Sequence, residues 1–139
     1  MTNAISKDLS DQVVVITGGS RGIGFAAAQA IGDLGATVVI VGRNSSNLIS
    51  AMNSLVSQGV DADSICVDVA DGDATYEALT NHALASRADI LINSAGVMSE
   101  KMAKTLRTSQ QEWHRVMSIN LDGTFNTISA IGPQMATRK

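Results

Sequence analysis

The sequence predicts an α/β protein whose helices cover both faces of a doubly wound parallel sheet. Short β-branched runs alternate with longer stretches of helical periodicity. The connections between them are short, which favours right-handed crossovers and parallel strands. A glycine-rich turn, Gly18 to Gly24, directly follows the first apolar run. That turn favours the same class, because it places a ligand at the carboxyl ends of the strands.

Four strands and four helices are expected in alternation. The strands are the apolar runs Val13–Ile16, Thr37–Val41, Ser64–Val67 and Ala88–Ile92. The first three helices are expected at Gly22–Leu34, Ser46–Gln58 and Asp73–Ala85. Gly35 and Gly59 are the expected stops of the first two helices. Asn44 or Ser45 is the expected cap of the second helix, because either side chain offers an oxygen to a free helix N–H.

The fourth helix is expected to be long. Ser109, followed three residues later by Glu112, matches a capping box. Apolar residues then recur at Trp113, Val116, Met117, Leu121, Phe125 and Ile128. A polar loop, residues 97–107, comes before this helix. Because the chain contains neither an internal repeat nor a linker, residues 1–139 are expected to form a single domain.

Composition narrows the class of protein and its partners. Hydrophobic residues make up 45% and charged residues 17% of the chain, which is typical of a globular protein. The net charge is −3 and no basic block is present, so neither nucleic acid nor an anionic membrane is an expected partner. The apolar runs are much shorter than the roughly 20 residues that span a bilayer. A lone cysteine, Cys66, and a polar start, residues 1–12, favour a cytoplasmic protein.

The glycine-rich turn has the layout of a phosphate-binding site. A strand leads into Gly18-Gly19-Ser20-Arg21-Gly22-Ile23-Gly24, and a helix starts within it. The bending positions favour glycine, because the backbone must turn tightly and come close to a ligand. The first turn of the helix supplies unpaired N–H groups and the positive end of a dipole.

Several other residues are interpreted as structural. The aspartates between Asp61 and Asp73 do not fit a calcium loop, and no Cys/His spacing indicates zinc, so no metal is expected. His82 and His114 are isolated on predicted helices and are expected to be exposed. Cys66 is expected to be a small core residue of the third strand.

Four motifs in order resemble the short-chain dehydrogenase/reductase family. They are Thr17-Gly18-x-x-x-Gly22-Ile23-Gly24, Asp68-Val69, Asn93-Ser94-Ala95-Gly96 and Ser118-Ile119-Asn120-Leu121. Together they span nearly the whole chain, and Ser94 is a mild departure because asparagine is commoner there. The resemblance implies a Rossmann-like sheet of about four strands in the order 3-2-1-4, followed by a long C-terminal helix.

The resemblance also implies a role for each matching residue. Gly18, Gly22 and Gly24 are expected to form the pyrophosphate turn, with Thr17 and Ile23 beside them. Asp68 is expected to accept a hydrogen bond from the adenine amino group, next to the Val69 backbone. The remaining motif residues are expected at the carboxyl edge of the sheet and in the proton relay: Asn93, Ala95 and Gly96 at the cofactor ribose, and Asn120 in a helix bend that holds a water. Plain structural roles for Asp68, as a capping carboxylate, and for Asn120, as a polar helix residue at an interface, stay open.

Charge near the end of the second strand favours NADP(H) over NAD(H). NAD enzymes of this fold place an acid there for the ribose diol, and such an acid repels a 2′-phosphate. This chain has Val41-Gly42-Arg43-Asn44 instead, and Arg21 lies in the glycine turn. Guanidinium groups suit a phosphate, because each offers a planar fork of donors. Ser20, Arg21, Arg43 and Asn44 are therefore the candidate ligands of the 2′-phosphate, although either arginine could simply lie in a solvated loop.

Catalysis in the resembled family needs residues that this sequence lacks. Members transfer hydride between the cofactor and a carbonyl or secondary alcohol, with a serine and a Tyr-x-x-x-Lys pair. The single tyrosine, Tyr76, is followed four residues later by Thr80. We therefore expect the cofactor-binding part of an NADP-dependent enzyme, inactive as 139 residues alone. The alternative is a naturally short, non-catalytic nucleotide-binding or interaction protein.

The fourth strand raises a question of association. If it has no neighbour on its far side, residues 89–92 form an apolar sheet edge, which is a template for pairing with another chain. We expect self-association, along this edge or helix on helix, or a second fragment that covers the edge.

Overall fold

The computed structural model describes residues 8–100 and 104–138, so residues 1–7 of the polar start and 101–103 of the expected loop lie outside it. One parallel sheet contains β1 (Val13–Thr17), β2 (Thr37–Gly42), β3 (Ala62–Cys66) and β4 (Ile90–Asn93). The strand order β3-β2-β1-β4 confirms the predicted order. Because all four strands run the same way, their carboxyl ends meet at one edge.

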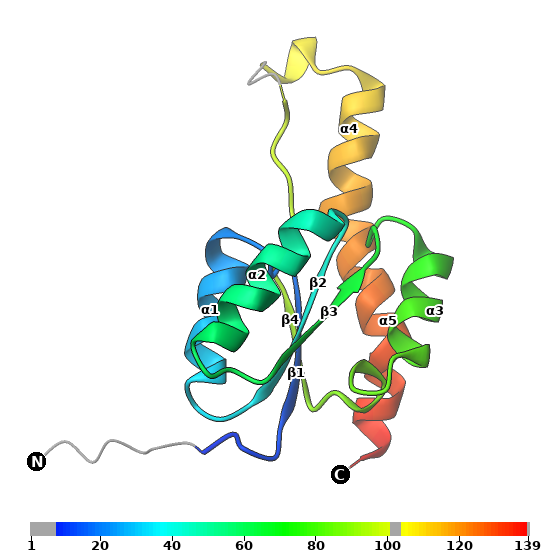
Figure 1. Cartoon of the computed structure of the whole chain (residues 1–139). Coiled ribbons are helices and arrows are strands. Elements are labelled where there is room, and N and C mark those ends of the chain that lie inside the picture. Colours follow the sequence, from blue (N-terminus) through cyan, green and yellow to red (C-terminus); the bar gives the residue numbers. More distant parts are fainter. Residues whose placement is uncertain (1–7, 101–103, 139) are drawn as a thin grey trace, which may run out of the picture.

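Helices cover both faces of the sheet (Figure 1). One face is covered by α1 (Gly22–Gly32) and α2 (Ser45–Ser57), and the other by α3 (Gly72–Asn81) and α5 (Gly123–Thr137). The shorter helix α4 (Gln110–Met117) extends beyond the carboxyl edge and leads into α5. This arrangement confirms the predicted α/β class with a long C-terminal helical segment.

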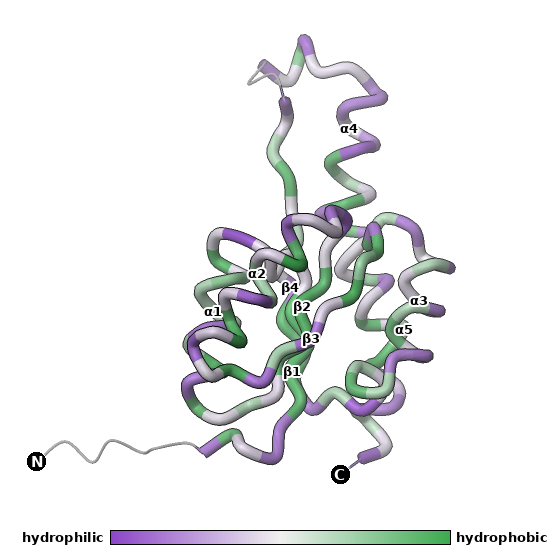
Figure 2. Tube along the Cα trace, viewed as in Figure 1, coloured by the Kyte–Doolittle hydropathy of each residue, from purple (hydrophilic) through white to green (hydrophobic). Residues whose placement is uncertain are grey.

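The central strands are buried on both sides, as the continuous apolar runs predict. Val14, Ile16, Val38 and Ile40 pack in the cluster that contains Ala28 of α1 and Leu48, Ala51 and Leu55 of α2. Val13, Val15, Val39 and Val41 alternate with them and pack in the cluster that contains Leu79 of α3 and Ala130 and Ile131 of α5. In Figure 2 the strands are hydrophobic, while hydrophobic and hydrophilic residues alternate along the helices. The two half-cores hold the strand ends at fixed positions.

Side-chain caps begin three of the helices. Asn44 accepts from the Asn47 N–H at 2.9 Å, which settles the choice of cap for α2. Asp71 accepts from the Ala74 N–H at 3.0 Å, and Ser109 from the Glu112 N–H at 3.1 Å. The capping box at Ser109 is only half formed, because the Glu112 carboxylate accepts from Arg115 and from the Glu100 N–H instead.

The third helix is shorter than predicted, and His82 is the reason. Helix α3 ends at Asn81 and a 3₁₀ turn follows at Ala85–Arg87. His82 Nδ1 accepts from the N–H groups of Leu84 and Ala85, each at 3.3 Å, while His82 Nε2 lies 3.3 Å from Asp63 Oδ2. The side chain is therefore half-buried and partnered, and the expectation that it is exposed was wrong.

One further expectation needs correction. Cys66 is exposed at the end of β3, with Sγ 3.7 Å from the Arg43 carbonyl oxygen, so it is not a core residue. The period-2 alternation that buries Ile65 turns Cys66 outward. Within the long C-terminal helical segment, a π-helical turn, Ser118–Asp122, lies between α4 and α5 and contains Asn120. Such single turns are often found at functional sites.

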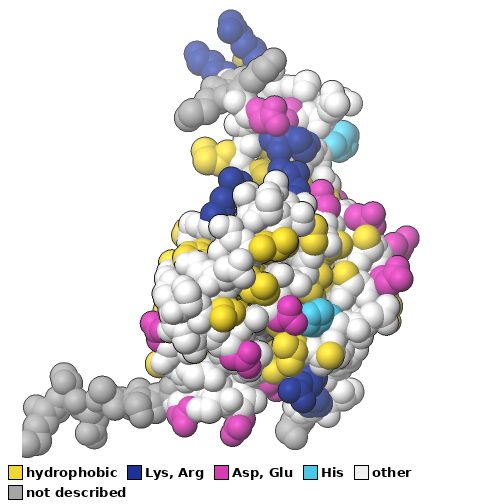
Figure 3. Space-filling model, viewed as in Figure 1, with side chains coloured by type: hydrophobic (Ala, Val, Ile, Leu, Met, Phe, Trp, Pro, Cys, Tyr) yellow, Lys and Arg dark blue, Asp and Glu magenta, His cyan; other side chains and the backbone are white. Residues whose placement is uncertain are grey.

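The surface is charged but not uniformly. In Figure 3, Lys and Arg side chains are visible around the projecting α4 end, and Asp and Glu side chains group on the side of α3. Within the described residues, no helix has the length and hydropathy needed to cross a membrane.

Candidate cofactor site

The turn after β1 depends on three glycines. Gly18 and Gly22 adopt φ angles of 67° and 57°, in the left-handed region that favours glycine. A Cβ at Gly24 would lie 2.4 Å from the Gly18 carbonyl oxygen, so only glycine lets α1 start this close to the turn. Arg21 precedes α1 without capping it through its side chain. The first N–H groups of the helix therefore receive no side-chain cap from Arg21.

A cavity of about 540 Å³ lies at the carboxyl edge of the sheet. Its walls come from the glycine turn, the ends of β2, β3 and β4, the start of α2 and the π-helical turn. The lining residues predicted from sequence are Gly18, Ser20, Arg21, Gly22, Ile23, Arg43, Asn44, Asp68, Val69, Ala95 and Gly96. The sequence motifs thus converge on one cavity, although they are spread over most of the chain.

Four predicted site residues do not line the cavity but hold its walls. Thr17 is 1% exposed, and its hydroxyl oxygen accepts from the N–H groups of Ser94 and Ala95, each at 3.1 Å. Gly24 lets α1 start close to the turn, because a Cβ there would strike the Gly18 carbonyl oxygen. Asn93 Oδ1 accepts from the Thr127 hydroxyl at 2.7 Å, which ties the end of β4 to α5. The fourth residue is Asn120.

Asn120 joins the π-helical turn to the segment after β4. Its Oδ1 accepts from the Val97 N–H at 2.8 Å, and its Nδ2 donates to the Val97 carbonyl oxygen at 2.9 Å. One carboxamide thus pairs with both the N–H and the carbonyl of Val97, as the backbone of a neighbouring strand would. It fixes the segment that carries the cavity residues Ala95 and Gly96.

A second bridge lies farther out on the same segment. Arg115 donates to the Met98 carbonyl oxygen at 3.0 Å and to Glu112 Oε2 at 2.8 Å. Glu112 Oε1 accepts from the Glu100 N–H at 2.8 Å. The Arg115 hydrogen bonds, followed by the Glu100 N–H, lower the pKa of the Glu112 carboxyl from 4.5 to about 2. Helix α4 therefore holds residues 98–100 through one ion pair.

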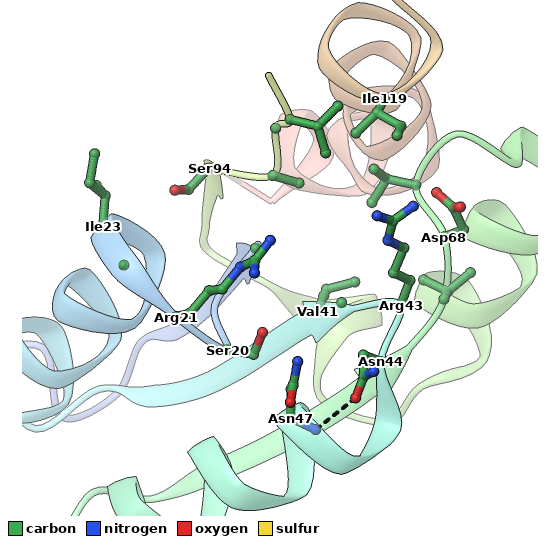
Figure 4. Close-up of a pocket in the computed structure, with 18 residues that line it drawn as sticks. Ser20, Arg21, Ile23, Val41, Arg43, Asn44, Asn47, Asp68, Ser94 and Ile119 are labelled. Atoms are coloured by element: carbon green, nitrogen blue, oxygen red, sulfur yellow. Dashed lines mark hydrogen bonds between the residues drawn. The ribbon is translucent and has the colours of Figure 1, made fainter. Parts of the chain in front are cut away.

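The cavity lining carries charges of both signs. Arg21 in the turn and Arg43 just after β2 extend into it, with Ser20 between them (Figure 4). Among the described lining residues, the single carboxylate is Asp68, whose Oδ1 accepts from the Ala70 N–H at 3.0 Å. The buried Val69 follows Asp68. The lining therefore offers two guanidinium groups to an anion and one carboxylate next to an apolar residue.

Sequence reasoning missed seven lining residues: Val41, Gly42, Asn47, Val67, Ser94, Val97 and Ile119. Val41, Gly42 and Val67 follow from strand ends that were recognised, so the motif boundaries were drawn too narrowly. Asn47 lies three residues after the cap Asn44, in the first turn of α2. A helical turn after a predicted cap is the signal that would have found it.

Fold and site together define an α/β protein with a dinucleotide-type turn. A family profile described as short chain dehydrogenase matches residues 12–139. The chain belongs to this family, as its motifs predicted.

Relatives agree over almost the whole chain. Gluconate 5-dehydrogenase of Gluconobacter oxydans is 34% identical over 134 residues, which cover 94% of this chain and 50% of that protein. A 3-oxoacyl-[acyl-carrier protein] reductase from Brucella melitensis with bound NAD has a TM-score of 0.86 and 37% identity, over 94% of this chain and 50% of that one. A metagenomic short-chain oxidoreductase in complex with NADP has a TM-score of 0.86 and 34% identity, over 94% and 59%. The chain spans about half the length of the curated relatives it matches.

Proposed function

We propose that this chain is the NADP(H)-binding part of a cytoplasmic short-chain dehydrogenase that acts on a carbonyl or secondary alcohol. One observation carries the choice of cofactor. Arg21 and Arg43 both line the cavity, and β2 ends without an acidic residue. Of the two solved structures above, one has bound NAD and the other is in complex with NADP.

The cavity supports an assignment of its residues. The turn from Thr17 to Gly24 holds the pyrophosphate, since a side chain at Gly18 or Gly24 would strike backbone atoms. Ser20, Arg21, Arg43 and Asn44 serve the 2′-phosphate. Asp68 and Val69 flank the adenine, and Asn93, Ala95 and Gly96 form the wall near the ribose. When bound, the cofactor supplies or accepts the hydride.

Asn120 acts in this proposal by position. Both ends of its carboxamide bond to Val97, and it lies in the π-helical turn. From there it fixes the wall of the cavity, and we assign the relay water to this bend. The 139 residues contain no Tyr-x-x-x-Lys, so we expect them to bind cofactor without turning over a carbonyl substrate. A positioned general acid–base contributes roughly 10² to 10⁴ in rate.

The substitution Arg43→Asp tests the cofactor assignment. It replaces a donor fork by a charge that repels phosphate, so NADPH affinity should fall at least tenfold relative to NADH affinity. Nucleotide titrations followed by fluorescence of the reduced nicotinamide give both constants. Arg87→Asp is the matched control, because Arg87 is exposed at the amino end of the sheet and makes the same change of charge. Unchanged relative affinities in Arg43→Asp would remove Arg43 from the site.

We also propose that the chain associates with another chain. This proposal applies above all to the alternative function, a non-catalytic interaction protein. Strand β4 is a sheet edge within the described residues. Leu121, Phe125 and Ile128 are 58%, 68% and 50% exposed along one side of the C-terminal helical segment. We expect dimers or pairing with a second polypeptide through these surfaces. Light scattering after size-exclusion chromatography should show association, and Phe125→Glu should weaken it. Ile49→Glu, an exposed change on α2, is the control and should leave association unchanged. A monomeric wild-type chain would refute this second proposal.

A further inference from the structure

We propose that Asn47 is a direct ligand of the cofactor's 2′-phosphate, and that Asn44 acts by positioning it. The inference rests on the proposed function, because it concerns the NADP end of the same cavity. It adds a residue that the sequence motifs do not mark, and it changes the role of one that they do.

The Asn44 carboxamide oxygen is already engaged. It accepts from the Asn47 N–H at 2.9 Å and from the Ser46 hydroxyl at 2.8 Å. Two donors on one oxygen fix the first turn of α2, which is the ordinary task of a capping asparagine. A side chain that holds its own helix in this way is constrained by the cap. Through this cap, Asn44 sets where the next turn points.

Asn47 lies on that turn and faces the cavity. Figure 4 shows its carboxamide directed toward Ser20, on the side where Arg21 enters. Among the described residues, its side chain has no hydrogen-bond partner, so its donor is available. The first turn of α2 also adds the positive end of a 13-residue helix. A neutral amide donor beside two guanidinium groups suits a phosphate dianion.

A second hollow supports this position. A groove of about 360 Å³ between α1 and α2 is lined by Ser20, Arg21, Phe25, Asn47, Ser50, Ala51 and Ser54. It shares Ser20, Arg21 and Asn47 with the main cavity. These three residues therefore stand where the main cavity opens sideways. A group that branches from a ribose in the main cavity would meet all three there.

Binding of adenosine 2′,5′-bisphosphate and of 5′-AMP, measured by calorimetry, tests the inference without any catalysis. We expect the wild-type chain to bind the bisphosphate at least tenfold more tightly. Asn47→Leu, which keeps the size and removes the donor, should lower that ratio about fivefold, or about 1 kcal/mol, with AMP affinity unchanged. Asn53→Leu is the matched control: it makes the same change at an exposed position of α2 that lines neither hollow, and its ratio should stay within twofold of wild type.

The outcomes separate the two proposals. A wild-type ratio near one would reject the NADP assignment, and this inference with it. A wild-type preference that persists in Asn47→Leu would reject the role of Asn47 alone. A loss in Asn53→Leu equal to that in Asn47→Leu would also overturn the role of Asn47, because the loss would then come from the helix and not from the site. Asn47→Ala, compared with Asn47→Leu by thermal melting, shows whether a change in ratio comes from the site or from an altered helix.

Discussion

Two regions form the walls of the cavity, and they are held by different kinds of contact. The turn after β1 packs backbone on backbone: Gly18 lies against Ala95 and Ser94, and the buried Thr17 hydroxyl accepts two N–H groups. The segment at 97–100 is held instead by the side chains of Asn120, Arg115 and Glu112. The first region is part of the core, and the second lies beyond it. Changes in the first should therefore weaken the whole fold, and changes in the second should act locally.

The largest effect is expected for Gly18→Ala. The new Cβ would lie 2.9 Å from backbone atoms of Ala95 and Ser94, at a φ of 67°. Left-handed backbone and overpacking together should lower the free energy of unfolding by about 3 kcal/mol. Gly22→Ala is the control, because its φ is 57° but no atom lies within 4 Å of the new Cβ. It should cost only about 1 to 2 kcal/mol. Urea unfolding of both variants measures the difference, and equal losses would mean that the Ala95 backbone moves aside freely.

Thr17→Val should have the next largest effect. The change keeps the shape and removes the acceptor of the Ser94 and Ala95 N–H groups. Leaving these part-buried donors unpaired should lower the free energy of unfolding by about 2 kcal/mol. Thr75→Val is the matched control, a fully buried threonine whose hydroxyl makes one 3.3 Å bond to the Asp68 carbonyl. That carbonyl also accepts from the Asp71 N–H, so the control should lose less than 1 kcal/mol. Equal urea midpoints in the two variants would contradict a bridging role for Thr17.

The same division explains what could be predicted from the sequence. Strands, helix caps and the glycine turn are local patterns, whereas the order of the strands was implied by the resemblance to the family. Local patterns and resemblance together therefore predict Thr17, Gly18 and Arg43 in one site. Three other features depend on hydrogen bonds between a side chain and the backbone of another segment or of a turn. They are the half-formed capping box, the end of α3 at His82, and the bridge from Asn120 to Val97. Periodicity carries no information about such meetings, so these features could not be predicted.

Asn120→Ala should have a small effect on the whole fold and a clear local one. It removes both bonds to Val97, which are exposed, so the free energy of unfolding should fall by no more than about 1 kcal/mol. The Val97 amide should nevertheless exchange with solvent faster, because its acceptor is gone. Hydrogen exchange at Val97 and at Val15, a core amide in β1, separates the two effects. Faster exchange at Val15 to the same degree would mean that the bridge belongs to the core.

The smallest effect, confined to acid, is expected for Glu112→Gln. Hydrogen bonds from Arg115 and the Glu100 N–H hold the pKa of the Glu112 carboxyl at about 2, below its ordinary 4.5. A carboxyl whose pKa is lowered by folding stabilises the fold fully above its unfolded value, and this contribution is lost as pH falls toward the folded value. The advantage of the wild type over Glu112→Gln should therefore be constant above pH 4.5 and shrink between pH 4.5 and about 2. Urea midpoints across that range measure it, with Glu77→Gln, an exposed change on α3, as the control. Because the ion pair holds only residues 98–100, hydrogen exchange of the Glu100 amide should speed up in this pH range before that of the core amides does. If both speed up together, α4 belongs to the same cooperative unit as the sheet.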